Sequence, residues 1–126
     1  MGRVMYEIFF EHNDDMLYVK ASGEQTLENN RRLALYITEK MKKLGIKKLF
    51  LDSHGFIGQP GTFADYDLAD FVSPLTIGGI EKIAFFHPVE TSEYSRFFET
   101  AARNKGINIR AFTLREKAEE WLKSED

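Results

Sequence analysis

The chain has 126 residues, of which 43% are hydrophobic and 29% charged, and its formal net charge is −3. This length suits a single domain with a substantial core, and so small a charge gives no reason to expect a nucleic-acid partner. The lack of cysteine excludes disulfides and thiolate chemistry, and it fits a cytoplasmic location. No apolar run approaches the ~20 residues that a membrane-spanning helix needs.

The first half of the chain predicts a β-hairpin, a long helix and a buried strand. Apolar and polar residues alternate on both sides of a turn cluster at 12–15, as the two strands of a hairpin do. Thr26 is a plausible N-cap, and Gly45 a plausible C-cap, for the amphipathic helix between them. Within the predicted strand at 48–52, the three consecutive apolar residues Leu49, Phe50 and Leu51 end at Asp52, which is typical of a central strand in a parallel sheet.

The second half alternates helices with strands. It first predicts a glycine-rich loop at 53–61, then a short helix at 62–72 capped by Thr62 and Asp65, and then a strand at 83–86. A helix from Thr91 or Ser92 to Gly106 and a strand at 109–112 follow. A Thr113–Glu116 capping box predicts the start of the last helix. The order ββαβαβαβα predicts one α/β domain over residues 1–126. We expect a mixed, mostly parallel sheet of about five strands with four helices, because strand–helix alternation favours right-handed parallel crossovers.

The glycines of the 53–61 loop recur every third residue at Gly55, Gly58 and Gly61. A phosphate-binding loop needs a lysine and a hydroxyl after its last glycine, and only Thr62 follows here. The spacing therefore indicates a flexible loop and not a nucleotide site.

Titratable residues follow two strands that we expect to be neighbours. Asp52, Ser53 and His54 come after the first, and His87 comes after the second, at the sheet edge where α/β proteins place their sites. A catalytic interpretation would make Ser53 a nucleophile with a histidine base, although no nucleophile-elbow spacing surrounds it. A metal interpretation would add Glu90, although the spacing follows no known metal motif. We expect no catalytic residue, metal or cofactor.

No lysine or arginine occurs from Leu49 to Glu81, a stretch that holds five acidic residues. Within it, the 62–72 helix would place two aromatic and two acidic side chains together on its outer side, namely Phe63, Tyr66, Asp67 and Asp70. Such a surface suits a partner with basic and apolar groups. The alternative is that both rings fold over neighbouring loops.

The chain resembles the STAS-like superfamily, in the branch related to sporulation anti-sigma-factor antagonists and SEC14-type domains. The resemblance rests on the hairpin, on Lys48-Leu49-Phe50-Leu51-Asp52, on Ile83-Ala84-Phe85-Phe86, and on the ending from Ala111-Phe112 to Trp121-Leu122. It implies a non-enzymatic protein that binds a partner protein or, in the SEC14-like relatives, an apolar ligand. True antagonists carry an Asp-Ser-Ser-Gly-like phosphorylation site, whereas this chain offers only Thr62 at the same helix start.

Two functional hypotheses follow. The leading one is a cytoplasmic protein-interaction module that uses the acidic-aromatic helix. The alternative is a small apolar-ligand binder with its ligand at the carboxyl-end rim, lined by Phe56, Phe63, His54 and His87. A metal-assisted hydrolase is a weaker third possibility.

The sequence also predicts self-association. If helices covered only one face of the sheet, the hairpin would expose an apolar strip made of Met5, Phe9, Met16 and Tyr18, and a homodimer would cover it. The alternative is a monomer in which the first or last helix covers that face.

Overall fold

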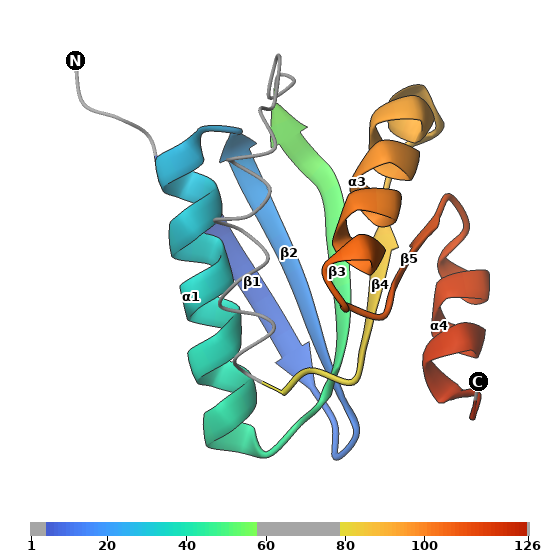
Figure 1. Cartoon of the computed structure of the whole chain (residues 1–126). Helices are drawn as coiled ribbons and strands as arrows, with labels where there is room; N and C mark the ends of the chain where they lie inside the picture. The colour runs from blue at the N-terminus through green and yellow to red at the C-terminus, as the bar shows by residue number, and fades with distance from the viewer. Residues whose placement is uncertain (1–4, 58–78, 126) are drawn as a thin grey trace.

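The structure, a computed structural model, describes residues 5–57 and 79–125. One five-stranded sheet organises these residues, with strand order β1-β2-β3-β4-β5 (Figure 1). Its strands are β1 (Glu7–His12), β2 (Met16–Glu24), β3 (Lys48–Ile57), β4 (Lys82–Phe86) and β5 (Ile109–Phe112). The β1–β2 hairpin is antiparallel and the other three pairings are parallel, so the predicted mixed sheet is confirmed.

Within the described residues, three helices connect or follow the strands: α1 (Leu27–Leu44), α3 (Ser92–Asn104), which a short 3-10 turn at Val89–Thr91 precedes, and α4 (Arg115–Lys123). The predicted ends of α1 are confirmed: Thr26 accepts a hydrogen bond from the Asn29 amide, and Gly45 closes the helix at φ 70°. The predicted capping box of α4 is wrong. Its N-cap is Leu114 and no side chain caps it, because the helix begins one residue later than expected. The expected helix at 62–72 lies outside the described residues.

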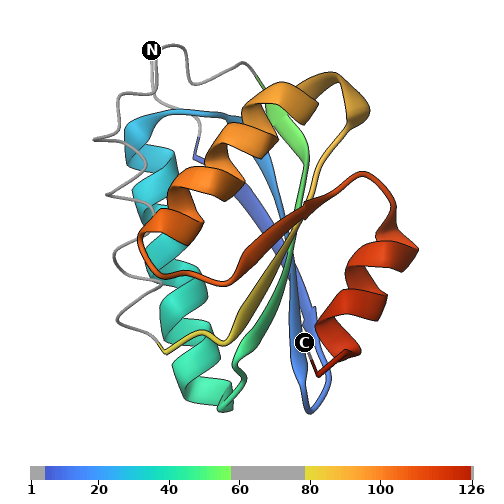
Figure 2. The same cartoon turned by 45° about the vertical axis from the view of Figure 1, so that its right-hand side comes forward.

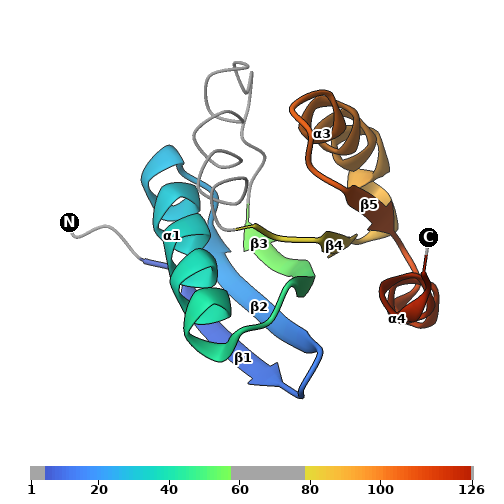
Figure 3. The ribbon, with the colours of Figure 1, turned by 60° about the horizontal axis from the view of Figure 1, so that its bottom comes forward.

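The helices divide between the two faces of the sheet (Figures 2 and 3). The larger core lies beneath α1 and α3, where Leu33, Ile37, Leu51 and Ile109 are almost fully buried. A second core on the opposite face joins α4 to β3, β4 and β5 through Phe50, Ala84, Trp121 and Leu122. Trp121 packs near Phe112, with ring centroids 5.8 Å apart.

The two-sided cover overturns part of the predicted apolar strip. Met16 is only 3% exposed because it belongs to the core beneath α4. Met5 leaves the strip as well, since its sulfur lies 3.1 Å from Nη1 of Arg32 on α1. Of the four predicted residues, Phe9 and Tyr18 remain on the part of the second face that α4 leaves open.

Among the described residues, no helix is both long enough and apolar enough to cross a membrane.

Candidate functional site

The strand β3 runs five residues past its predicted end at Asp52, to Ile57, so the loop predicted from residue 53 is wrong at its start. Lys20 pairs with Asp52 but Ser22 pairs with Gly55, which leaves one extra residue on β3. This is a β-bulge. A Cβ at position 55 would collide with Oγ of Ser22 and lie 2.9 Å from the Ala21 carbonyl oxygen. Gly55 therefore permits a close approach of two strands and does not mark a flexible turn.

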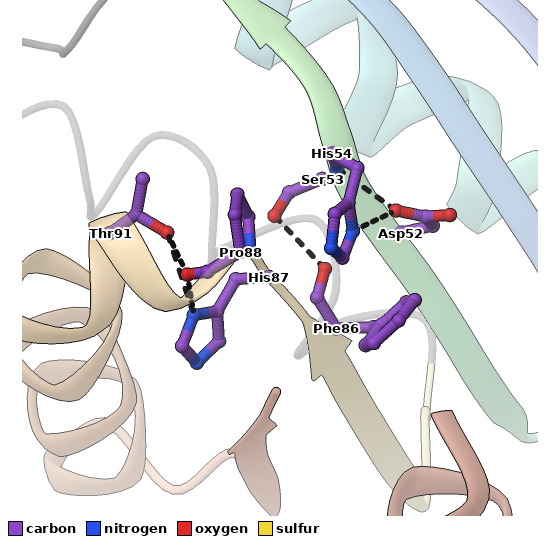
Figure 4. Close-up of polar contacts among 7 residues, drawn as sticks. All are labelled: Asp52, Ser53, His54, Phe86, His87, Pro88 and Thr91. Atoms are coloured by element: carbon purple, nitrogen blue, oxygen red, sulfur yellow. Dashed lines mark hydrogen bonds and ion pairs between the residues drawn. The ribbon is translucent and has the colours of Figure 1, made fainter. Parts of the chain in front are cut away.

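The bulge brings Asp52 and His54 together on the α4 face of the sheet (Figure 4). Oδ1 of Asp52 accepts a hydrogen bond from the His54 amide at 2.9 Å, and it lies 2.8 Å from Nδ1 of the His54 ring. Because an ionised carboxylate only accepts, Nδ1 carries the proton of this second bond. The ring also packs on Phe86, with centroids 4.3 Å apart.

His87 lies on the other face, so the predicted rim shared by the two histidines is wrong. Its ring is 4% exposed and stacks on Phe85, which belongs to the core beneath α1 and α3. Nδ1 of His87 lies 2.8 Å from the Pro88 carbonyl oxygen, which also accepts from Thr91. Figure 4 shows the side chains of His87 and Phe86 pointing in opposite directions, because successive residues of a strand point to opposite faces, and His54 packs on Phe86.

The catalytic interpretation has no supporting geometry in this region. Oγ of Ser53 donates a hydrogen bond to the Phe86 carbonyl oxygen at 3.0 Å. The hydroxyl therefore holds β3 to β4, and no hydrogen bond between Ser53 and either histidine occurs in the described part of the chain. Within residues 5–57 and 79–125 there is also no group of three histidine, aspartate or glutamate side chains that could hold a metal ion.

The predicted ligand rim is divided as well. Phe56 stacks on Tyr6, with centroids 5.1 Å apart and ring planes 7° from parallel, and it packs against the core beneath α1. The Tyr6 hydroxyl donates to Oδ1 of Asn30 on α1 at 2.6 Å. Burial raises the pKa of Tyr6, and Tyr94 adds a smaller electrostatic contribution. Phe56 and His87 thus lie on the face opposite His54.

Five predicted site residues lie outside the described residues: Thr62, Phe63, Tyr66, Asp67 and Asp70. The acidic-aromatic surface that they define stays a prediction.

The structure reveals a further surface, because α4 covers β3–β5 and leaves β1 and β2 open on the second face. An open groove of about 380 Å³ lies there. Its lining includes Phe9, Glu11, Tyr18, Lys20, Phe50, Asp52 and Arg115. The Arg115 guanidinium forms one wall, 5.0 Å from the ring centre of Phe50 and 5.8 Å from that of Tyr18.

Sequence reasoning found Phe9 and Tyr18 on this face but not their charged neighbours. Glu11 and Lys20 lie two residues from them on the same strands, so the period of two that located the aromatic residues also places these charges beside them. Arg115 carries no such signal, since it reaches the groove only through the packing of α4.

No family model matches the sequence, and no curated protein matches it. Solved structures do match. One is an uncharacterised protein of the DUF3478 family with a SpoIIAA-like fold from Shewanella loihica, at 20% identity and a TM-score of 0.58, with 97% of this chain and 98% of that one covered. Another is an anti-sigma factor antagonist from Mycobacterium paratuberculosis, at 14% identity and a TM-score of 0.62, with 94% and 95% covered.

The chain has a STAS-like fold. The predicted resemblance is confirmed at the level of fold, over nearly the whole chain. In this STAS-like fold, the Asp52–His54 pair lies in the second half of the central strand, and the open groove lies beside it on the second face.

Proposed function

We propose that this chain is a non-enzymatic protein-interaction module that acts in the cytoplasm. The observation that carries the proposal is the match of its STAS-like fold, over 94% of the chain, to a protein described as an anti-sigma factor antagonist. Fold alone leaves function open, so the site must add to the argument. The described part of the chain supports it, because the Ser53 hydroxyl is held by a backbone carbonyl and the two histidines are on opposite faces.

The surface proposed for the partner is the acidic-aromatic one, made of Phe63, Tyr66, Asp67 and Asp70. It lies in a stretch from Leu49 to Glu81 without a single lysine or arginine, which favours a partner with basic and apolar groups. Thr62 precedes these four residues and is the hydroxyl available there for modification.

A pull-down from cells of the source organism tests the proposal. The double variant Phe63→Ala, Tyr66→Ala should lose protein partners that the wild type retains, because aromatic anchors contribute much of the energy of an interface. Phe97→Ala is the matched control, since Phe97 is an exposed aromatic residue on α3, far from that segment in the sequence. An unchanged set of partners in the double variant would refute this surface.

The geometry of the described residues does not favour the alternative of an apolar ligand at the carboxyl-end rim. Three of its four rim residues are described, and they divide between the two faces of the sheet: Phe56 and His87 on one, and His54 on the other. We also propose that the chain self-associates, and that the open face of the hairpin is the surface through which it does so.

A further inference from the structure

The uncovered part of the second sheet face belongs to β1 and β2. The Phe9 side chain is 59% exposed there, although it is large and apolar. The core beneath α4 takes in Met16 and Phe50, and Tyr18 packs partly against that core. The hairpin thus presents exposed aromatic surface next to the groove that Arg115 closes on its other side.

Four side chains form a compact quartet on this open face, namely Phe9, Glu11, Tyr18 and Lys20. In the antiparallel register, Phe9 lies opposite Lys20 and Glu11 lies opposite Tyr18. One diagonal of the quartet is therefore aromatic, from Phe9 to Tyr18. The other diagonal is ionic, from Glu11 to Lys20.

The two charges of the quartet are not neutralised within the described chain. Neither Glu11 nor Lys20 forms an ion pair with any residue of 5–57 or 79–125, and both are exposed. By contrast, Asp52 is engaged by His54, and Arg115 by Glu119 at 3.2 Å. Among the described residues, this face thus carries one charge of each sign without an ion-pair partner, one on either side of the aromatic diagonal.

Such a pattern is complementary to itself. A two-fold axis that lies in the interface along the aromatic diagonal places Phe9 and Tyr18 each opposite the same residue of the partner subunit. The same axis places Glu11 opposite Lys20 of the partner subunit, and Lys20 opposite Glu11 of the partner subunit. Two copies related in this way form two ion pairs while their aromatic residues meet at the axis. The strands then cross at a large angle, which is one of the two common ways in which sheets pack face to face.

We propose that the quartet is the interface of a homodimer, in which Lys20 pairs with Glu11 of the partner subunit and the same pair forms a second time by symmetry. Phe9 meets Phe9 of the partner subunit at the axis, beside the groove of about 380 Å³ that Phe9, Tyr18 and Arg115 line. This inference deepens the proposed interaction function by naming one partner, and none of its residues belongs to the 62–72 segment. Because the patch is small, the dimer forms in the micromolar range and its mass depends on concentration.

Charge reversal with complementation tests the pairing. Sedimentation equilibrium of the wild type should show a mass rising towards twice that of the chain. Lys20→Glu and Glu11→Lys should each raise the dimer dissociation constant roughly tenfold or more, because each variant places like charges in both pairs. An equimolar mixture of the two should regain dimerisation as a heterodimer. One chain then carries acids at both positions 11 and 20, the other carries cations at both, and each of the two pairs joins opposite charges.

Lys105→Glu, a reversal at the end of α3, is the matched control and should leave the dissociation constant unchanged. A wild type that stays monomeric throughout the micromolar range would overturn the proposal. So would a dimer that both single variants retain, or a mixture that does not recover. The pull-down with Phe63→Ala, Tyr66→Ala is read separately, so its failure removes the heterologous partner surface and leaves the homodimer standing.

Discussion

At the scale of single residues, Gly55 sets the geometry at the end of the central strand. Its neighbour across the sheet, Ser22, leaves no room for a side chain, and the bulge beside it aligns Asp52 with His54. The pair therefore depends on a glycine in a strand, where glycine is otherwise unfavourable.

Replacing Gly55 with alanine should destabilise the protein by about 1–3 kcal/mol, as overpacking of a tight site does. Urea denaturation followed by circular dichroism measures the change. Adding Ser22→Gly should recover part of the loss, because the collision with Oγ and Cβ of Ser22 disappears while the close approach to the Ala21 carbonyl remains. A Gly55→Ala protein as stable as the wild type would contradict this account of the bulge.

Tyr6 predicts a pH dependence of stability. Burial raises its pKa in the folded chain, whereas the unfolded chain has the ordinary value of about 10. Above about pH 10 the unfolded state therefore loses the phenolic proton while the folded state keeps it, and the free energy of unfolding falls as the pH rises. Below that pH this contribution is present in full.

The measurement is urea denaturation between pH 8 and 11, compared between wild type and Tyr6→Phe. The variant should lose about 1–2 kcal/mol at pH 8, because the hydrogen bond to Asn30 is gone, and its stability should then fall less steeply above pH 10. Tyr36→Phe leaves this hydroxyl in place and should keep the wild-type slope. Parallel slopes for wild type and Tyr6→Phe would show that Tyr6 does not carry the effect.

At the scale of secondary-structure elements, α4 decides which part of the second face is open. Its Trp121 is 7% exposed and packs on Phe112, so Trp121→Ala should cost about 3–5 kcal/mol in thermal or chemical unfolding. Leu114→Ala, at a side chain that is 61% exposed just before the helix, should cost less than about 0.5 kcal/mol. A loss under ~1 kcal/mol for Trp121→Ala would mean that the helix contributes little to the fold.

A buried lysine, Lys82, forms hydrogen bonds at the C-terminal end of α4. Nζ of Lys82 donates to the carbonyl oxygens of Trp121 and Ser124 at 2.8 and 2.7 Å, and to Oγ of Ser124 at 3.0 Å. A cation suits the last carbonyls of a helix, where partial negative charge gathers. Lys82→Met should therefore destabilise the chain by about 1–3 kcal/mol and raise hydrogen exchange in α4 above that in α1. Equal protection of the two helices in the variant would contradict the role of this contact.

The elements with strong periodicity could be predicted from the sequence. The hairpin, α1 with both caps, and the three parallel strands follow from alternation, from a 3.6-residue stripe and from continuous apolar runs. The ends of elements were less predictable. Nothing local marks the extra residue in β3, since a bulge depends on the neighbouring strand. The N-cap of α4 is Leu114 and not the predicted Thr113, and no side chain caps the helix.

The arrangement of side chains in the candidate site was even less predictable from the sequence than the ends of the elements. Asp52 was grouped with His54 because both were expected to follow the same strand; the structure instead places both within β3, with Nδ1 of His54 2.8 Å from Oδ1 of Asp52. The placement of His87 and Phe56 with them was wrong, since it assumed that residues near the carboxyl ends of strands converge whichever face they occupy. Charged residues of the hairpin were overlooked because polar positions in an alternating strand are expected to face water.

At the scale of the whole molecule, the described part of the STAS-like fold has α1 and α3 on one face and α4 on the other, where none of these three helices covers the hairpin. We propose two surfaces for partners on this chain. One is the proposed homodimer quartet, and the other is the acidic-aromatic surface predicted from Phe63, Tyr66, Asp67 and Asp70. A module with two such surfaces can join its own copy and a different protein at the same time.

Native mass spectrometry of the protein purified from its own cells tests the central claim most directly, because it reports bound protein, ligand and metal together. The account predicts species that contain this chain and a second, different protein, with the chain present once or twice. A chain found only alone, or carrying only a lipid-sized adduct or a transition metal, would contradict a function in protein interaction.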